Sequence, residues 1–150
     1  MAGTFTNLLY HIVFSTKYRR PQIVAGLRED LYSYIGGIIR ADDATLVEIG
    51  GIADHVHLVT RFRTQRSVAE MVKTFKAKSS KWVNERRRGD DRFYWQTGYA
   101  AFTVSPSQLS NVIRYVRNQQ EHHRRVTFQE EYISLLQRHG VEYDERYLWD

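Results

Sequence analysis

The sequence predicts an α+β fold, namely a ferredoxin-like split βαβ sandwich with an antiparallel sheet and additional C-terminal helices. Over about residues 5–104, strand-like and helix-like hydrophobic patterns alternate in the order β-α-β-β-α-β, which is the order of the split βαβ motif. Two amphipathic segments follow, over about 106–123 and 127–150. No Pro- or Gly-rich linker interrupts the chain, so residues 1–150 are expected to form a single domain.

The elements of the first half follow from hydrophobic spacing. Residues 7–16 are apolar and β-branched and predict a buried strand. Pro21 opens a segment over 21–40 whose apolar side chains recur at helical spacing. Residues 44–51 and 54–62 predict two further strands, and the short link between them favours a hairpin.

The second half is marked by helix-capping motifs. An apolar stripe predicts a helix over 68–88, and the aromatic segment 92–104 predicts one or two strand segments. A helix is then predicted over 106–123, and a shorter one begins near 127 and ends at Gly140. The expected capping boxes are Ser67 with Glu70, Ser105 with Gln108, and Thr127 with Glu130.

Composition narrows the class of protein. The 150 residues carry 22 Lys and Arg against 17 Asp and Glu, a net charge of +5, and they include no cysteine. This excludes disulfides, thiolate zinc sites and cysteine nucleophiles within the sequence. The N-terminus lacks the pattern of a secretory signal, and no apolar run is long enough to cross a membrane. We therefore expect a cytoplasmic protein without a membrane partner, and the basic balance favours a polyanion.

Cationic clusters alternate with aromatic residues along the chain. Such alternation suits a groove for single-stranded nucleic acid, because phosphates attract cations and unstacked bases stack on flat rings. Solvated helix faces are the alternative explanation for the charges, and core packing is the alternative for most of the rings. The candidate phosphate contacts are Lys17, Arg19, Arg20, Lys73 and Lys76.

Two histidines on the third predicted strand form the clearest candidate site. Side chains alternate along a strand, so His55 and His57 point to one face of the sheet, and Val56 and Leu58 point to the other. We expect the two imidazoles on the exposed face, at a separation suited to a shared divalent cation. The alternative is a chance pair of polar residues on an open sheet face, since a His-x-His pattern alone is weak evidence.

A tyrosine and a glutamine on the predicted helix 106–123 form a second candidate pair. Tyr115 and Gln119 are four residues apart and therefore one turn apart on one flank of the helix. Tyr115 lies roughly 110° from the centre of the predicted buried stripe, so its phenol can reach a neighbouring site. Packing of the tyrosine and solvation of the glutamine are the alternative. The stripe consists of Leu109, Val112, Ile113 and Val116.

Together these residues are typical of phosphoryl-transfer chemistry. Two imidazoles and the amide oxygen of Gln119 are donors for a cation such as Mg²⁺ or Mn²⁺. A cation there would polarise a phosphate oxygen and stabilise charge on the leaving 3′-oxygen. The phenolate of Tyr115 would attack phosphorus and conserve the phosphodiester energy in a phosphotyrosine.

The sequence resembles the single-tyrosine HUH transposases of small bacterial insertion sequences and their REP-associated relatives. Three motifs carry the resemblance, in matching order and spacing. They are HIVFSTKYRR at 11–20, DHVHL at 54–58, and Tyr115-x-x-x-Gln119. The resemblance extends over nearly the whole chain.

The resemblance implies specific roles for four residues. It implies that His55, His57 and Gln119 bind Mg²⁺ or Mn²⁺ and that Tyr115 is the catalytic nucleophile. It also implies an enzyme that recognises DNA hairpins near the ends of an element, cuts single strands and rejoins them, with a 5′-phosphotyrosine and a free 3′-hydroxyl as intermediates. The expected assembly is a homodimer whose tyrosine helix can dock on the other subunit, acting at the nucleoid of a bacterial or archaeal cell.

Three other functions fit parts of the pattern. A rolling-circle initiator or relaxase-type nuclease also uses a His-x-His strand, but such proteins are often larger and commonly use a third histidine. A non-catalytic, domesticated hairpin-binding protein is expected to have lost the tyrosine or a ligand. A plain metal-binding ferredoxin-like domain leaves Tyr115 and Gln119 without a role. Since all four positions are present, the transposase is favoured.

Overall fold

The computed structural model describes residues 3–87, 89 and 91–150 and confirms the predicted α+β class. Its strands form an antiparallel sheet in the order β2-β3-β1-β4, which is the strand order of a split βαβ sandwich. The first elements are β1 (Leu8–Ser15), α1 (Ala25–Ala41), β2 (Thr45–Ile52), β3 (His55–Phe62), α2 (Val68–Arg86) and β4 (Ala100–Thr103).

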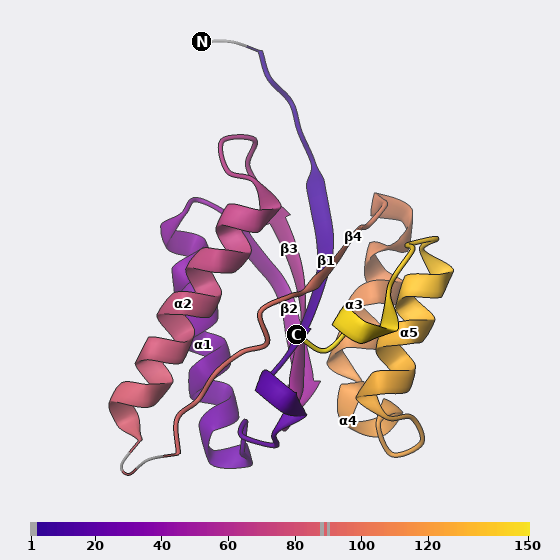
Figure 1. The fold of residues 1–150 in the computed structure, drawn as a ribbon. Helices are drawn as coiled ribbons and strands as arrows, with labels where there is room; N and C mark the ends of the chain where they lie inside the picture. The colour runs from indigo at the N-terminus through magenta and orange to yellow at the C-terminus, as the bar shows by residue number, and fades with distance from the viewer. Residues whose placement is uncertain (1–2, 88, 90) are drawn as a thin grey trace.

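Helices cover both faces of the sheet. Figure 1 shows α1 and α2 on one face and the C-terminal helices on the other. The molecule therefore has three layers, with the sheet in the middle. The C-terminal helices are α3 (Leu109–Arg117), α4 (Gln119–His122) and α5 (Phe128–Arg138), and short 3₁₀ segments occupy η1 (Lys17–Arg19), η2 (Pro106–Gln108) and η3 (Glu145–Tyr147).

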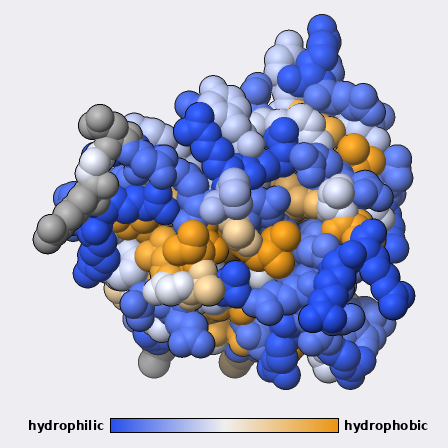
Figure 2. All heavy atoms as spheres, turned by 90° about the horizontal axis from the view of Figure 1, so that it is seen from below, coloured by the Kyte–Doolittle hydropathy of each residue, from blue (hydrophilic) through white to orange (hydrophobic). Residues whose placement is uncertain are grey.

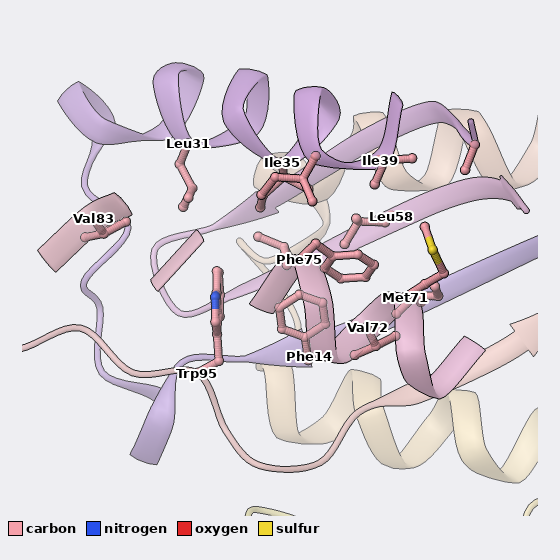
Figure 3. Close-up of a cluster of buried hydrophobic side chains, with 14 of the residues drawn as sticks. Phe14, Leu31, Ile35, Ile39, Leu58, Met71, Val72, Phe75, Val83 and Trp95 are labelled. Carbon is pink, nitrogen blue, oxygen red and sulfur yellow. The ribbon is translucent and has the colours of Figure 1, made fainter. Parts of the chain in front are cut away.

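The main hydrophobic core lies between the sheet and the pair α1 and α2. Phe14 of β1 and Leu58 of β3 are fully buried there, against Phe75 of α2. Figure 3 shows these side chains pointing toward one another, with Trp95 beside them. The rings of Phe14 and Trp95 meet edge to face with centroids 4.8 Å apart. Each such side chain contributes roughly 1.5–3 kcal/mol on burial, so this layer holds the sheet rigid.

A second hydrophobic cluster lies on the opposite face, under α5. Val13 of β1 and Phe102 of β4 pack there against Phe128 and Tyr132 of α5. The tail after Gly140, to which the sequence assigns no role, completes this layer. Leu148 is buried, and the main-chain oxygen of Asp150 accepts hydrogen bonds from Gly98 N at 2.8 Å and Gln96 Nε2 at 3.1 Å.

Side chains alternate between the two layers as the strand pattern predicts. Val56 and Leu58 enter the main core, whereas His55 and His57 point to the other face. The hairpin between β2 and β3 is tight, because Ile52 pairs with His55. That face of the sheet is not exposed, and this part of the prediction was wrong. The C-terminal helices cover it, and both histidines have an exposed fraction of 0%.

Element boundaries differ from the predictions where backbone donors have other partners. Helix α1 begins at Ala25 rather than Pro21, since Ile23 N donates to Ala53 O of the hairpin turn. In the segment 92–104, strand structure is confined to Ala100–Thr103 and a bridge between Thr16 and Trp95. The other residues of that segment are held by bonds such as the one from Phe93 N to Asn84 Oδ1.

The capping predictions were correct at two of three helix starts. The boxes Ser67 with Glu70 and Thr127 with Glu130 are both formed. At the third start the Ser105 side chain makes no cap bond to the backbone and instead contacts Ser107 Oγ at 3.1 Å. The segment begins with a 3₁₀ turn there, which moves the α-helical start to Leu109.

The predicted helix 106–123 is broken within its last third. Asn118, with φ −97° and ψ 25°, separates α3 from α4. The predicted apolar stripe is also only partly covered: Val116 is buried, but the rest is half-buried. The half-buried members are Leu109, Val112 and Ile113.

A glycine allows α3 to lie directly on the sheet. A Cβ at Gly50 of β2 would lie 2.1 Å from the main-chain oxygen of Val116 in α3, which is closer than any side chain permits. Gly50 pairs with His57 across the sheet. Because Gly50 has no side chain, the backbone of α3 at Val116 can lie close to the histidine pair. Tyr115 is the neighbouring residue of that helix.

Figure 2 shows that hydrophilic residues cover most of the face seen from below, with hydrophobic atoms gathered in a few central patches. Among the described residues, no helix combines the length and the apolar character needed to cross a bilayer.

Replacing Gly50 by alanine is expected to push α3 away from β2. We expect Gly50→Ala to lower the free energy of unfolding by about 1–3 kcal/mol, as overpacking in other proteins does. Chemical denaturation would measure the change. Gly26→Ala is the matched control, because nothing lies within 4 Å of a Cβ at that position in α1. Equal stability of the two variants would contradict the close approach of α3.

Candidate active site

The two histidines of β3 are fixed by partners on their outer ring nitrogens. His55 Nδ1 lies 2.7 Å from Asp54 Oδ1. His57 Nδ1 lies 2.8 Å from Nε2 of His11, which projects from β1 on the same face. Hydrogen bonds of this kind set the ring orientation, and in metal sites they hold the other nitrogen toward the ion. Both Nε2 atoms therefore aim at the space beneath α3 and α5.

Burial sets the protonation of these rings. Burial lowers the pKa of His57 to about 4 and that of His11 to about 3. Both rings are therefore neutral at pH 7, which is the form that binds metals. Burial also acts to lower the pKa of His55, but its hydrogen bonds with Asp54 and Glu131 outweigh that effect, so the pKa is raised.

Tyr115 of α3 lies beside the histidines, as predicted. Its ring stands nearly perpendicular to the His57 ring, with centroids 5.7 Å apart. The hydroxyl donates a hydrogen bond to the carboxylate of Glu131. Burial, together with the negative charge of Glu131, raises the pKa of the phenol above its ordinary value. The phenol is half-buried, so a substrate can still approach it.

Gln119 joins the same cluster from the start of α4. Its Oε1 lies 3.1 Å from His55 Nε2, and its Nε2 donates to the main-chain oxygen of Tyr115 at 3.3 Å. The side chain has an exposed fraction of 1%. The structure thus brings together all four residues predicted for the site, namely Tyr115, His55, His57 and Gln119, although Gln119 does not lie on the same unbroken helix as Tyr115.

Two further residues of the cluster were missed by the sequence analysis. Glu131 of α5 has an exposed fraction of 2%, and its Oε1 lies 2.8 Å from His57 Nε2 and 3.3 Å from His55 Nε2. His123, which follows α4, places its Nε2 3.1 Å from the same oxygen. Burial acts to raise the pKa of the Glu131 carboxyl, but the imidazoles of His123, His55 and His57 outweigh it and hold the pKa well below its usual range.

One signal for Glu131 was present in the sequence. The buried positions of α5 recur at helical spacing, and Glu131 occupies one of them. A carboxylate on an apolar stripe needs a buried partner. His123 carried no comparable signal, because it sits in a polar run near a helix end. The buried positions of α5 are Phe128, Glu131, Tyr132, Leu135 and Leu136.

The cluster has donors suited to a divalent cation. One ligand atom from each of four residues lies within 4.8 Å of the others, a spacing that donors around one ion can adopt. Imidazole nitrogens and a carboxylate oxygen are common ligands of divalent transition metals. The four residues are His55, His57, His123 and Glu131.

Three of the predicted DNA contacts lie around η1. Lys17 Nζ lies 5.5 Å from the ring centroid of Tyr18 and 5.8 Å from that of Tyr94. Arg20 lies over Tyr18, and Arg19 lies over Trp149. We call Lys17, Tyr18, Arg19, Arg20 and Tyr94 the cationic surface. Tyr18 and Tyr94 are 64% and 52% exposed, so their rings are open to a ligand.

The other two predicted contacts lie on α2, outside this surface. Lys73 is exposed on that helix. Lys76 donates to the main-chain oxygens of Gln96, Thr97 and Gly98 at 2.6, 3.2 and 2.9 Å. These bonds use all three ammonium hydrogens of Lys76 to fix the segment before β4. A phosphate contact at Lys76 would require some of them to break.

Comparison with known proteins assigns the chain to a family. Residues 4–119 match the family model described as Transposase IS200 like. The chain belongs to this transposase family. The expectation from its three motifs is thereby confirmed. The match ends at Gln119, so His123 and Glu131 lie beyond it.

Individual transposases resemble the chain over most of its length. The transposase for insertion sequence element IS200 of Salmonella typhimurium is 29% identical over 127 residues, which cover 81% of this chain and 82% of that protein. The ISDra2 transposase TnpA of Deinococcus radiodurans is 23% identical over 126 residues, which cover 79% of this chain and 89% of that protein.

Two solved structures share the fold. A transposase structure from Deinococcus radiodurans superimposes with a TM-score of 0.63 at 24% identity, over 79% of this chain and 95% of that one. A REP-associated tyrosine transposase bound to a REP hairpin superimposes with a TM-score of 0.57 at 11% identity, over 77% of this chain and 70% of that one. Both likenesses support the α+β fold of this transposase.

The cluster is expected to bind Mn²⁺ and to gain stability from it. A ligand at about one hundred times its dissociation constant stabilises a protein by about 2.7 kcal/mol. For a chain of this size that corresponds to a rise in Tm of about 5–10 °C. Calorimetry with and without Mn²⁺ would measure the shift, and EDTA should reverse it. The double variant His55→Ala/His57→Ala should show no shift, and an unshifted wild type would refute metal binding.

Proposed function

We propose that this transposase cuts and rejoins single-stranded DNA through a covalent bond to Tyr115, with a divalent cation held by His55, His57 and Gln119. The observation that carries the proposal is the meeting of a phenol and metal-type donors in one buried cluster. Tyr115 Oη and His57 Nε2 both contact the Glu131 carboxylate. The proposed nucleophile and a proposed metal ligand are therefore bridged by the side chain of Glu131.

The proposed reaction is a transesterification. Tyr115 Oη forms a bond to phosphorus while the bond from phosphorus to the 3′-oxygen breaks. The phenol gives up its proton, and the departing 3′-oxygen gains one. Because one phosphodiester replaces another, rejoining needs no other energy source. A bound divalent cation would neutralise charge on the phosphate and on the leaving oxygen.

The side chains around Tyr115 orient it and limit the access of water. The Glu131 carboxylate and the main-chain contact of Gln119 fix the phenol and its helix turn. A cavity of about 490 Å³ borders Tyr115, and its lining includes Asn111 and Arg138. The DNA strand can enter there, with Arg138 supplying positive charge for its phosphates. Exclusion of water by the side chains packed around Tyr115 would protect the phosphotyrosine from hydrolysis.

The cationic surface supplies a place for the rest of the DNA. Thr16 N donates to Asp54 O at 2.9 Å, so the surface is attached to the turn that precedes His55. Exposed rings between cations suit unpaired bases and phosphates. The REP-associated transposase that shares the fold is bound to a hairpin, and we propose hairpin recognition for this chain too.

We also propose that the protein acts as a homodimer. Except for Val116, the apolar stripe on α3 is half-buried within one chain, and a partner would cover it. In this chain Tyr115 lies beside its own histidines, which favours sites built from a single subunit. A mixture of Tyr115→Phe and His57→Ala chains tests the alternative, because cleavage is restored only if subunits share sites.

The central test is a search for the covalent intermediate. Labelled single-stranded DNA from the flanks of the gene would be incubated with protein and Mn²⁺ or Mg²⁺, then run on a denaturing gel. We expect a heat-stable adduct with the wild type and none with Tyr115→Phe or after EDTA treatment. An adduct retained by Tyr115→Phe would disprove the nucleophile. Tight hairpin binding by all variants without any adduct would favour a non-catalytic binding protein.

The cationic surface predicts a salt-dependent affinity for DNA. For single strands, each neutralised phosphate contributes about −0.7 to the slope of log affinity against log salt. We expect Arg19→Gln/Arg20→Gln to make the slope less negative by about 1.4, measured by fluorescence anisotropy. Arg63→Gln is the control, because Arg63 pairs with Asp43 at the other end of β3. An unchanged slope in the double variant would place the DNA elsewhere.

A further inference from the structure

Several ligand-type nitrogen and oxygen atoms of the site converge. His55 Nδ1 lies 2.7 Å from a carboxylate oxygen of Asp54, which can only accept, so the ring hydrogen sits on Nδ1. In the neutral ring Nε2 then carries a lone pair. That atom faces Gln119 Oε1 at 3.1 Å and Glu131 Oε1 at 3.3 Å, which are both acceptors.

His123 repeats this arrangement. Its Nδ1 lies 2.6 Å from the main-chain oxygen of Val126, so the hydrogen again sits on Nδ1. Its Nε2 therefore presents a lone pair to Gln119 Oε1 at 2.9 Å and Glu131 Oε1 at 3.1 Å. Gln119 offers its oxygen rather than its amide hydrogens, because its Nε2 donates to Tyr115 O. The contacts therefore bring ligand-type atoms of His55, His123, Gln119 and Glu131 together, and either a bound cation or protons on the imidazoles can satisfy them.

The separations fit ligands of a single ion. Two donors about 2.1 Å from one ion and at right angles to each other lie about 3.0 Å apart. The contacts of Glu131 Oε1 with the Nε2 atoms of His57 and His123 are 2.8 and 3.1 Å. A ring that binds metal typically donates its other N–H to a carboxylate or a main-chain oxygen, as His55 and His123 both do.

We propose that His123 and Glu131 are ligands of the same divalent cation as His55, His57 and Gln119, and that Glu131 also positions Tyr115. Glu131 Oε1 faces the imidazoles, while Oε2 accepts the hydrogen bond of the Tyr115 hydroxyl. The carboxylate thereby ties the metal site to the nucleophile. This inference rests on the proposed function for the role of the site, but the ligand set can be tested by itself.

The enlarged donor set has a consequence for metal preference. Three imidazoles with a carboxylate and an amide oxygen are richer in nitrogen than Mg²⁺ sites usually are. We therefore expect the site to bind Mn²⁺ more tightly than Mg²⁺. Manganese is also the useful probe, because its electron paramagnetic resonance signal reports both the free ion and the coordinated nitrogen.

Binding of Mn²⁺ to variants tests the two new ligands. We expect Glu131→Gln and His123→Gln each to weaken Mn²⁺ binding at least ten-fold, as measured from the free-ion signal. The matched controls are Glu130→Gln and His139→Gln, which change the same residue types outside the cluster and should stay within about two-fold of the wild type. Glu130 is the exposed capping residue next to Glu131. Unchanged affinity in both site variants would overturn the proposal.

A measurement on the wild type avoids dependence on the folding of variants. Pulsed electron paramagnetic resonance of bound Mn²⁺ counts coupled histidine nitrogens, and we expect three coordinated rings. Only two coordinated rings would overturn the proposed set of three imidazole ligands. If the wild type binds no Mn²⁺, protons rather than a metal satisfy the converging acceptors, and the proposal fails.

The positioning role of Glu131 has its own readout. With Mn²⁺ saturating, Glu131→Gln is expected to slow adduct formation beyond what its weaker metal binding explains, whereas Glu130→Gln keeps the wild-type rate. An equal rate in Glu131→Gln would leave Glu131 without influence on Tyr115 and overturn that part. A wild type that binds Mn²⁺ through three rings yet forms no adduct would instead refute the proposed function, so the two failures are distinguishable.

Discussion

A carboxylate buried away from water must have partners, because an uncompensated charge there costs several kcal/mol. Glu131 is in this position, and its partners come from β3, from α3 and from the residue that follows α4. One side chain of α5 thus connects the sheet with α3 and with the residue directly after α4. The relative positions of His57 and Tyr115 depend on this connection, since each contacts a different oxygen of the same carboxylate.

The tyrosine helix is held differently from the helices on the other face. Helices α1 and α2 bury several large apolar side chains each, whereas Val116 is the buried residue of α3. Its docking relies on close backbone contact at Gly50 and on polar bonds, including the pair of Arg117 with Glu48 at 2.7 Å. A helix attached in this way is positioned accurately yet weakly. Such an attachment would suit the proposed reaction, in which Tyr115 carries a DNA end from one strand to another.

Much of the fold and four of the six site residues follow from local sequence patterns. Strand alternation placed His55 and His57 on one face, and the spacing of Tyr115 and Gln119 placed both on one flank of a helical segment. The strand prediction holds in the structure because it depends on the geometry of a single element. Tyr115 and Gln119 also reach one cluster, although Asn118 breaks the helix that was predicted to carry both. The split βαβ order follows in the same way, from the sequence of hydrophobic periods and capping boxes.

What local patterns could not provide is the meeting of elements far apart in the chain. The face that carries His55 looks exposed until the helices after residue 105 cover it, and His123 gains its importance only from the docking of those helices. Glu131 is different, because its position among the buried residues of α5 was readable. A charged residue on an apolar stripe conflicts with the pattern around it, and such conflicts concentrate at functional sites. In a chain that already offers paired histidines and a tyrosine, that conflict is the sequence-level sign of a further site residue.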